Sequence, residues 1–318
     1  MGISGSLNLK KILLLGSGGF LGTNLRDYFE VNYSSEYKLI NVEGKDQLDI
    51  KNFDLFNDFI AKNKPEIIIN AAAFVGGIAY GSKFPAKILH DNSQIVLNIY
   101  ESARLNNIEK VINPISNCAY PGDASLYKEE SFWDGKPHDS VFNYGFTRRL
   151  IVAHGDAYFS QYNLNSVNIV MSNMYGPHDH FDEERSHALG ALINKIYNAK
   201  SLNEKKITIW GNGNPIREWL FVKDACEAIA RSILLPNGHH FMNVGVNKGI
   251  SIIDLAKLIS QKIEWNGEFI FDTSKQDGAI EKRVDGKYSN NLLNWMPETN
   301  LEKGIEETVD WYVREKRK

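Results

Sequence analysis

The feature that most constrains this chain is a cluster of glycines between an apolar segment and a helix-like one. Gly16-Ser17-Gly18-Gly19-Phe20-Leu21-Gly22 follows the apolar segment 11–15 and leads into the helix-like segment 22–29. Glycines at 16, 19 and 22 permit a tight turn, close approach of a phosphate to the backbone, and close packing of helix on strand. The first turn of the helix would offer free N–H groups to an anion. The pattern predicts a dinucleotide-binding turn that opens a βαβ unit. The residues expected to contact the cofactor are Gly16, Gly19, Phe20, Leu21 and Gly22. A purely structural glycine turn is the alternative.

Short apolar segments and helix-like segments alternate through the first half of the chain. Strands are expected at 11–15, 38–42, 65–70, 110–114 and 166–171, and helices at 22–29, 52–62, 88–106 and 142–162. The segment 65–70 contains the apolar run 67–69, and such runs are typical of parallel strands that are covered on both faces. The alternation predicts an α/β protein with a Rossmann-like, doubly wound parallel sheet.

This regular alternation is lost after Gly176. Residues 178–184 are polar and are expected to form a loop, and a strand is expected at 207–211. Helices are expected at 188–200, 252–262 and 301–313. We therefore expect a dinucleotide-binding domain at residues 1–175 and a smaller substrate-binding lobe at residues 176–318, whose segments interleave with the sheet.

Composition and charge exclude several classes of protein. The 318 residues are 43% hydrophobic and 24% charged, which argues against disorder. The net charge of −3 provides no positive electrostatic field that would attract a nucleic acid or an anionic membrane. No apolar run approaches the roughly 18–20 residues of a membrane span, and no secretory signal precedes the first strand. Two cysteines, Cys118 and Cys226, cannot form a disulfide framework and are weak support for a metal site. We expect a soluble, cytoplasmic protein with no metal ion, no nucleic-acid partner and no membrane.

The residue at the end of the second expected strand bears on the choice of nicotinamide cofactor. Glu43 lies about 20 residues beyond the glycine turn, where an acid would bind the ribose 2′-hydroxyl of NAD. A carboxylate there repels a 2′-phosphate, whereas Lys45 could accept one, and both could also be solvated loop charges. The cofactor is predicted to be NAD or NADP, with NAD favoured.

Two short motifs supply residues suited to proton transfer. Ser116 and Cys118 follow the expected strand 110–114, and Tyr144 and Arg148 are four residues apart, so they share one face of the expected helix 142–162. A phenol whose pKa is lowered toward neutral by an adjacent cation can exchange a proton with a hydroxyl or carbonyl group. A nearby serine can hold the same oxygen. Ser116, Tyr144 and Arg148 are therefore candidate catalytic residues.

With these motifs the chain resembles the extended short-chain dehydrogenases/reductases, and among them the GDP-L-fucose synthases, which are NADPH-dependent 3,5-epimerase/4-reductases acting on GDP-4-keto-6-deoxymannose. The resemblance runs from about residue 11 to residue 313. It is carried by the segments 70–78, 116–121, 144–148, 172–179, 186–187 and 210–218. The Val-Gly-Gly and Tyr-Gly-Pro-His-Asp stretches within these segments are more specific than the glycine turn.

The resemblance implies a role for each matching position. Ser116 and Tyr144 become the reductase pair, in which Tyr144 gives a proton to the C4 oxygen, while Cys118 and His187 become the epimerase base and acid. It implies cofactor contacts at Ala71, Ala72, Ala73 and Arg148. It implies substrate contacts at Val75, Gly76, Asn173, His187, Trp210, Arg217 and Lys282. It also implies a GDP-linked nucleotide-sugar substrate and a homodimer formed through the segments 88–106 and 144–162.

Several of these residues also have a structural explanation when taken singly. Cys118 could be a small buried apolar residue, and Trp210 a core residue. His187 could be a polar residue at a helix end, and Arg217 could pair with Glu218 at the surface. The joint order of the motifs favours the functional interpretation for these four. Cys226 and the loop residues His178, Asp179 and His180 are interpreted as structural.

Three positions depart from the pattern of the GDP-L-fucose synthases. Arg148 replaces the usual lysine, and Gly18 and Glu43 stand where arginines would serve the 2′-phosphate of NADPH. Arginine keeps the positive charge but is planar and hard to deprotonate. The missing arginines favour NAD. An NAD-dependent nucleotide-sugar C4 dehydrogenase or 4-epimerase is therefore the alternative enzyme, and a non-catalytic nucleotide-binding protein is the alternative outside the enzymes.

Overall fold

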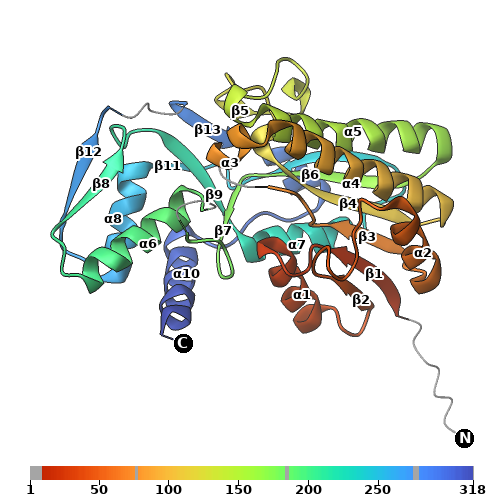
Figure 1. Ribbon diagram of the computed structural model, residues 1–318, viewed down its shortest axis with the longest axis horizontal. Helices are drawn as coiled ribbons and strands as arrows, with labels where there is room; N and C mark the ends of the chain where they lie inside the picture. The colour runs from red at the N-terminus through yellow and green to blue at the C-terminus, as the bar shows by residue number, and fades with distance from the viewer. Residues whose placement is uncertain (1–8, 76–77, 183–185, 275–278, 318) are drawn as a thin grey trace, which may run out of the picture.

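A six-stranded parallel sheet forms the centre of the computed structural model, which describes residues 9–75, 78–182, 186–274 and 279–317 (Figure 1). The strands occur in the order β10-β6-β4-β3-β1-β2, and each neighbouring pair is parallel. They are β1 (Lys10–Leu15), β2 (Tyr37–Val42), β3 (Ile67–Asn70), β4 (Lys110–Ser116), β6 (Asn165–Met171) and β10 (His239–Val244). The predicted α/β class with a doubly wound parallel sheet is confirmed.

Helices cover both faces of this sheet, which explains why its strands are apolar throughout. One face packs against α2 (Phe53–Asn63), α4 (Pro85–Leu105) and α5 (Phe142–Tyr162), and the other against α1 (Phe20–Asn32) and α7 (Val222–Ser232). Successive side chains of a strand point to opposite faces. Leu13 and Leu15 of β1 accordingly enter the first core, and Ile12 and Leu14 enter the second.

The order of the strands creates a crevice beside β1. The chain passes from β1 to the edge strand β2 and then returns to β3 on the other side of β1. In an open α/β sheet the ligand binds at such a switch point, outside the carboxyl ends of the strands. Gly16 follows β1 and Ala71 follows β3, so the glycine turn lies at this crevice.

A second lobe is built mainly from the later part of the chain and contains two small sheets (Figure 1). One pairs β8 (Lys206–Trp210) with β12 (Glu268–Asp272); the other has the order β11-β9-β13-β5, with β7 also paired to β9. Its strands are β5 (Leu126–Tyr127), β7 (Asn173–Tyr175), β9 (Ile216–Phe221), β11 (Gly249–Ser251) and β13 (Glu281–Val284). The helices α6 (Ala188–Ser201), α8 (Ile252–Ile263) and α10 (Leu301–Lys316) share its apolar core.

Segments from the second half of the chain also complete the central sheet. β10 pairs with β6 at the edge of the sheet, and α7 covers one face. The short helices α3 (Ile78–Lys83) and α9 (Lys287–Leu292) occupy connections. The division at residue 175 stays a prediction. Within the described ranges, no helix combines the length and the apolar character that crossing a bilayer requires.

Candidate active site

The glycine turn after β1 packs directly against the loop after β3. Gly16 has φ +74°, and a Cβ atom there would lie 2.8 Å from both the carbonyl oxygen of Ala71 and the Cα of Ala72, so only glycine fits. Gly19 precedes α1 in an extended conformation, and the first turn of α1 has no acidic residue. Its N–H groups are therefore suited to a phosphate, as the pyrophosphate of a dinucleotide requires.

Glu43 lies beside the glycine turn at the end of β2. A Cβ atom built on Gly18 would be 3.2 Å from the Cβ of Glu43, and both residues line a surface hollow with Asn41, Gly44, Asp46 and Gln47. The exposed carboxylate of Glu43 forms an ion pair with Arg26, with Nη1 and Oε1 3.6 Å apart. Lys45 instead lines a neighbouring hollow. The acid that we expected to contact the ribose thus lies at the same end of the sheet as the glycine turn.

The turn that carries Cys118 is packed against α5. Residues Asn117–Ala119 form a single 3-10 turn after β4, and the Ser116 hydroxyl accepts the Cys118 N–H at 3.3 Å. Arg149 of α5 donates from Nε to the carbonyl oxygen of Ala119 at 2.7 Å. Gly145 allows this approach, because a Cβ atom there would overlap the Cys118 carbonyl oxygen. Cys118 and Tyr144 are therefore held as neighbours by backbone packing.

Tyr144 and Arg148 stack on one face of α5. The guanidinium carbon of Arg148 lies 4.8 Å from the centre of the Tyr144 ring, and Arg148 is only 3% exposed. Its Nη2 donates to Oδ1 of Asn92 at 3.0 Å, while its buried Nε has no hydrogen-bond partner among the described residues. An unpartnered buried donor beside Tyr144 suits the binding of a polar ligand atom, such as an oxygen of the cofactor.

Burial raises the pKa of Tyr144 above its ordinary value, and the nearby thiol of Cys118 adds to this effect. The charge of Arg148 lowers the same pKa, as the sequence predicted. The expected net shift toward neutral is nevertheless wrong, because the loss of hydration outweighs the arginine. The phenol therefore stays protonated at neutral pH.

Two cations from the second lobe face the same region. Arg217 of β9 and Lys282 of β13 are direct partners across neighbouring parallel strands. Burial lowers the pKa of both side chains, and Arg217 lowers that of Lys282 further, whereas the Cys118 thiol raises it. Two adjacent, partly desolvated cations are suited to binding a diphosphate, and the influence of the Cys118 thiol on the pKa of Lys282 indicates that the pair lies near the Cys118 turn.

Asn173 connects the two lobes beside this cation pair. Its side-chain nitrogen donates to the carbonyl oxygen of Glu218 in β9 at 2.9 Å, and its side-chain oxygen accepts from Asn117 at 3.4 Å. It therefore joins the turn that carries Cys118 to the strand that carries Arg217.

His187 is the N-cap residue of α6 and is exposed to solvent. Partial desolvation by the surrounding residues lowers the pKa of its imidazole, and the nearby His180 lowers it further. Its role as the epimerase acid stays a prediction. Asp179 lies in the preceding loop, where desolvation raises its pKa to about 7. The ring of His178 instead packs at a tilt against that of Trp311, with the ring centroids 4.9 Å apart. In the described part of the chain, no three His, Cys, Asp or Glu side chains are grouped to hold a metal ion.

The remaining predicted residues lie in different environments. Trp210 is 69% exposed at the end of β8, so the core interpretation is excluded for it. Val75 and Ala73 are exposed on the loop after β3, whereas Ala71 and Ala72 are partly buried against the glycine turn. Gly76 lies outside the described residues. Cys226 is buried in the core, as interpreted from the sequence.

Two fully buried residues that support the site were missed. Asn92 of α4 accepts the Phe74 N–H at 3.0 Å and donates to the Phe74 carbonyl oxygen at 2.8 Å, which fixes the loop after β3. Glu218 of β9 accepts the Val284 N–H at 2.7 Å and so holds β13 beside β9. In each case the sequence places a polar residue within an apolar pattern, and this could have indicated a buried supporting role. Asn92 lies among Ile88, Ile95 and Val96 at helical spacing. Glu218 precedes the apolar segment Trp219-Leu220-Phe221.

The fold and this site define an NAD(P)-dependent α/β enzyme. A family model described as the NAD dependent epimerase/dehydratase family matches residues 12–245. The chain belongs to this family. The predicted enzyme class, an NAD(P)-dependent oxidoreductase/epimerase of the extended short-chain dehydrogenase/reductase type, is therefore confirmed.

Individual relatives span nearly the whole chain. A GDP-L-fucose synthase from Azorhizobium caulinodans is 31% identical over 96% of each chain. A GDP-L-colitose synthase from Yersinia pseudotuberculosis is 31% identical over 96% of this chain and 99% of that one. Among solved structures, a GDP-L-fucose synthetase from Naegleria fowleri bound to NADP has a TM-score of 0.88 and 26% identity, covering 97% of this chain and 94% of its own. The predicted resemblance to the GDP-L-fucose synthases is confirmed.

Proposed function

We propose that this enzyme epimerises a GDP-linked 4-keto-deoxy sugar at C3 and C5 and then reduces its C4 carbonyl group. The observation that carries the proposal is the packing of the Cys118 turn against the α5 face that bears Tyr144. One small region then holds a thiol, a protonated phenol and a pair of cations. The names of the relatives support a GDP-sugar as the substrate.

Each residue of this region has a chemically suitable role. As a thiolate, Cys118 would remove a proton next to the C4 ketone, and His187 would return one to the opposite face. Tyr144 would then protonate the C4 oxygen while Ser116 holds it, and Arg217 and Lys282 would bind the diphosphate. The bound reduced nicotinamide would supply the hydride to C4.

The direct test is to incubate the protein with GDP-4-keto-6-deoxymannose and either NADH or NADPH. We expect the reduced-nicotinamide absorbance to fall and solvent hydrogen to enter C3 and C5. Cys118→Ser should abolish this incorporation, because an alcohol is a far weaker base than a thiolate. Cys226→Ala, which changes the other cysteine inside the core, should retain it. Lack of cofactor oxidation with both nucleotides would contradict the reductase assignment, and undiminished exchange in Cys118→Ser would exclude Cys118 as the base.

We propose NADH as the preferred cofactor, although the relative from Naegleria fowleri binds NADP. Glu43 supports this proposal, because its exposed carboxylate beside Gly18 would repel a 2′-phosphate. Glu43→Arg is expected to shift the ratio of kcat/KM for NADH over NADPH at least tenfold toward NADPH, which corresponds to about 1.4 kcal/mol. Glu36→Arg, which makes the same charge change at the opposite end of β2, should leave the ratio unchanged. A ratio that is equal in the two variants would contradict this role of Glu43.

The proposal includes a homodimer formed by the neighbouring helices α4 and α5 (Figure 1). Leu97 and Leu105 of α4 and Tyr162 of α5 are each more than 40% exposed, and exposed apolar groups of this kind are typical of an interface. We expect a dimer in analytical ultracentrifugation and a monomer for the double variant Leu97→Lys/Tyr162→Lys. Leu55→Lys, on an exposed part of α2, should leave the dimer intact. A wild-type protein that sediments as a monomer would contradict the proposal.

The reaction also requires Cys118 to be a free thiol, and both cysteines are free in the structure. A reducing compartment maintains this state. We therefore propose a cytoplasmic location.

A further inference from the structure

Two loops border the crevice beside β1, where the dinucleotide is expected. The loop after β2 spans residues 43–52 and begins with Glu43 beside the glycine turn, so it lies at the expected ribose of the adenosine half. The loop after β3 begins with Ala71 against Gly16, so it lies at the expected pyrophosphate. The two loops thus approach the cofactor from neighbouring strands.

The loop after β3 continues toward the catalytic candidates on α5. The N–H of Phe74 donates to Oδ1 of Asn92 at 3.0 Å, and the same oxygen accepts from Nη2 of Arg148 at 3.0 Å. The guanidinium of Arg148 lies over the ring of Tyr144. This loop therefore extends from the pyrophosphate toward the nicotinamide half, whereas the loop after β2 serves the adenosine half.

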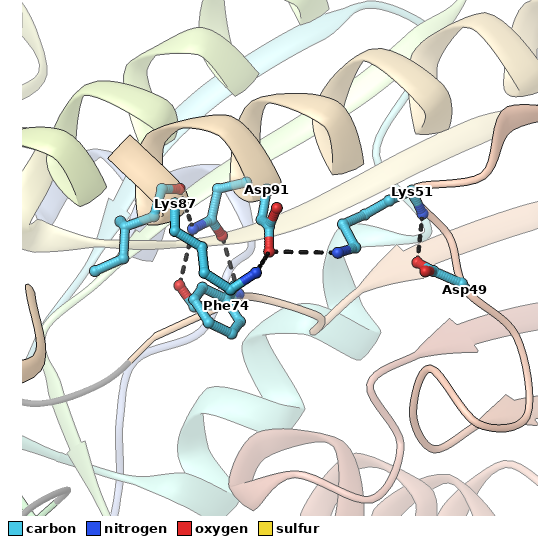
Figure 2. A network of polar contacts seen from close by, with 7 residues as sticks. Asp49, Lys51, Phe74, Lys87 and Asp91 are labelled. Carbon is cyan, nitrogen blue, oxygen red and sulfur yellow. Dashed lines mark hydrogen bonds and ion pairs between the residues drawn. The ribbon is translucent and has the colours of Figure 1, made fainter. Parts of the chain in front are cut away.

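A single buried carboxylate of α4 is connected to both loops. Asp91 is 5% exposed and accepts from Nζ of Lys51 at 3.3 Å and from Nζ of Lys87 at 2.8 Å. Lys51 belongs to the loop after β2, where its N–H donates to Oδ1 of Asp49 at 3.0 Å. The ammonium group of Lys87 also lies 5.0 Å from the centre of the Phe74 ring, in a cation–π contact. Figure 2 shows Asp91 between the two lysines, so that it links one loop to the other.

The two lysines keep the Asp91 carboxylate ionised. Burial raises the pKa of Asp91, but the hydrogen bonds from Lys87 and Lys51 outweigh burial and hold this pKa below its ordinary value. Ion pairs between fully exposed groups contribute little to stability. Here the carboxylate is buried, so both ammonium groups are needed to compensate for its lost hydration. The lysine side chains themselves are 32% and 51% exposed, so they can return to water when the carboxylate is removed.

We propose that Asp91 is a positioning residue that holds the loops after β2 and β3 in the arrangement that binds the nicotinamide dinucleotide. It acts through Lys51 and Lys87 rather than on the reacting atoms. The inference rests on the proposed use of a reduced nicotinamide cofactor, but not on the identity of the sugar substrate. When the loops are released, only a fraction of the molecules is competent to bind, and the apparent Kd rises by the inverse of that fraction.

The test is the near-isosteric variant Asp91→Asn, studied by calorimetric titration of the protein alone with NADH and, in parallel, with NADPH. A neutral amide cannot pair with two ammonium groups, so the loops lose their common anchor. We expect the Kd of the nucleotide that the wild type binds more tightly to rise about tenfold, which corresponds to about 1.4 kcal/mol. The kcat at saturating cofactor should stay essentially unchanged, because the variant affects binding and not the chemical step.

Hydrogen–deuterium exchange provides a second readout on the loops themselves. Without cofactor, the backbone amides of residues 43–52 and 71–75 should exchange faster in Asp91→Asn than in the wild type. Saturating cofactor should restore their protection. The variant should fold, because Asn98 of α4 still donates to the carbonyl oxygen of Ile50 at 2.8 Å.

The matched control is Glu101→Gln, which removes a carboxylate paired with Arg104 from the far end of the same helix. Its Kd should equal that of the wild type. An unchanged or lower Kd in folded Asp91→Asn would overturn the proposal, as would an equal rise in Glu101→Gln or a wild type that binds neither nucleotide.

If Asp91→Asn does not fold, the single variants Lys51→Met and Lys87→Met provide the decision, since each releases one loop. A raised Kd in both supports the proposal, and an unchanged Kd in either one overturns it. Because the titration needs no sugar, it remains decisive even if the protein fails to reduce any GDP-linked substrate.

Discussion

Gly145→Ala is expected to lower kcat/KM by about 100-fold or more and to destabilise the protein, although alanine is the better helix former. Alanine inside a helix is favoured over glycine by about 1 kcal/mol. Here the added methyl group would overlap the carbonyl oxygen of Cys118 and lie 2.9 Å from Cβ of Pro137. Both are rigid parts of the chain, so α5 and the Cys118 turn must separate. A displacement of about 1 Å between reacting groups can cost 100-fold in rate.

Gly81→Ala is the matched control for this variant, because Gly81 also lies within a helix, α3, and a Cβ atom there meets nothing closer than 3.8 Å. Steady-state kinetics and thermal unfolding of both variants should show a loss only for Gly145→Ala. Wild-type kinetics in Gly145→Ala would show that contact between α5 and the Cys118 turn does not set the geometry of the site.

Tyr144→Phe is expected to lower the kcat of reduction by about 10²–10⁴-fold while leaving solvent-hydrogen exchange at C3 and C5 largely intact. The phenol supplies the proton for the C4 oxygen, whereas the exchange depends on Cys118. Stopped-flow absorbance measures the first activity, and NMR of the sugar in heavy water measures the second. Tyr162→Phe, which removes an exposed hydroxyl from the same helix, should affect neither.

Two outcomes would contradict these roles. Rapid reduction by Tyr144→Phe would show that another group protonates the C4 oxygen. Loss of both activities with normal folding would show that the two half-reactions share the phenol, so that Tyr144 and Cys118 act together rather than in sequence.

The local features of the fold were predictable because they depend on neighbouring residues. The strand at 67–70 contains the apolar run 67–69, and α5 was predicted with its observed bounds of 142 and 162. β10 was missed because His239-His240-Phe241-Met242-Asn243-Val244 lacks an apolar run and its partner β6 lies about 70 residues earlier. Such long-range pairing leaves little trace in the sequence of a single strand.

The candidate site was predictable where a motif carries it. The glycine turn, the Cys118 turn and the Tyr144–Arg148 pair are each encoded within a few residues, so their contacts could be anticipated. The pairing of Arg217 with Lys282 depends instead on β9 and β13, which are more than 60 residues apart in the chain and meet only in the folded sheet.

By itself the sequence determined the parallel α/β fold, the glycine turn after β1 and the candidate catalytic side chains, because apolar periodicity and short motifs are local properties. Only the tertiary structure decided the electrostatics of the site. Burial raises the pKa of Tyr144 although the charge of Arg148 lowers it. The hydrogen-bond partner of Arg148 is the amide of Asn92, which lies 56 residues earlier in the chain. Hydration and the nearest charges determine how readily a group ionises, and both depend on which parts of the chain pack around it.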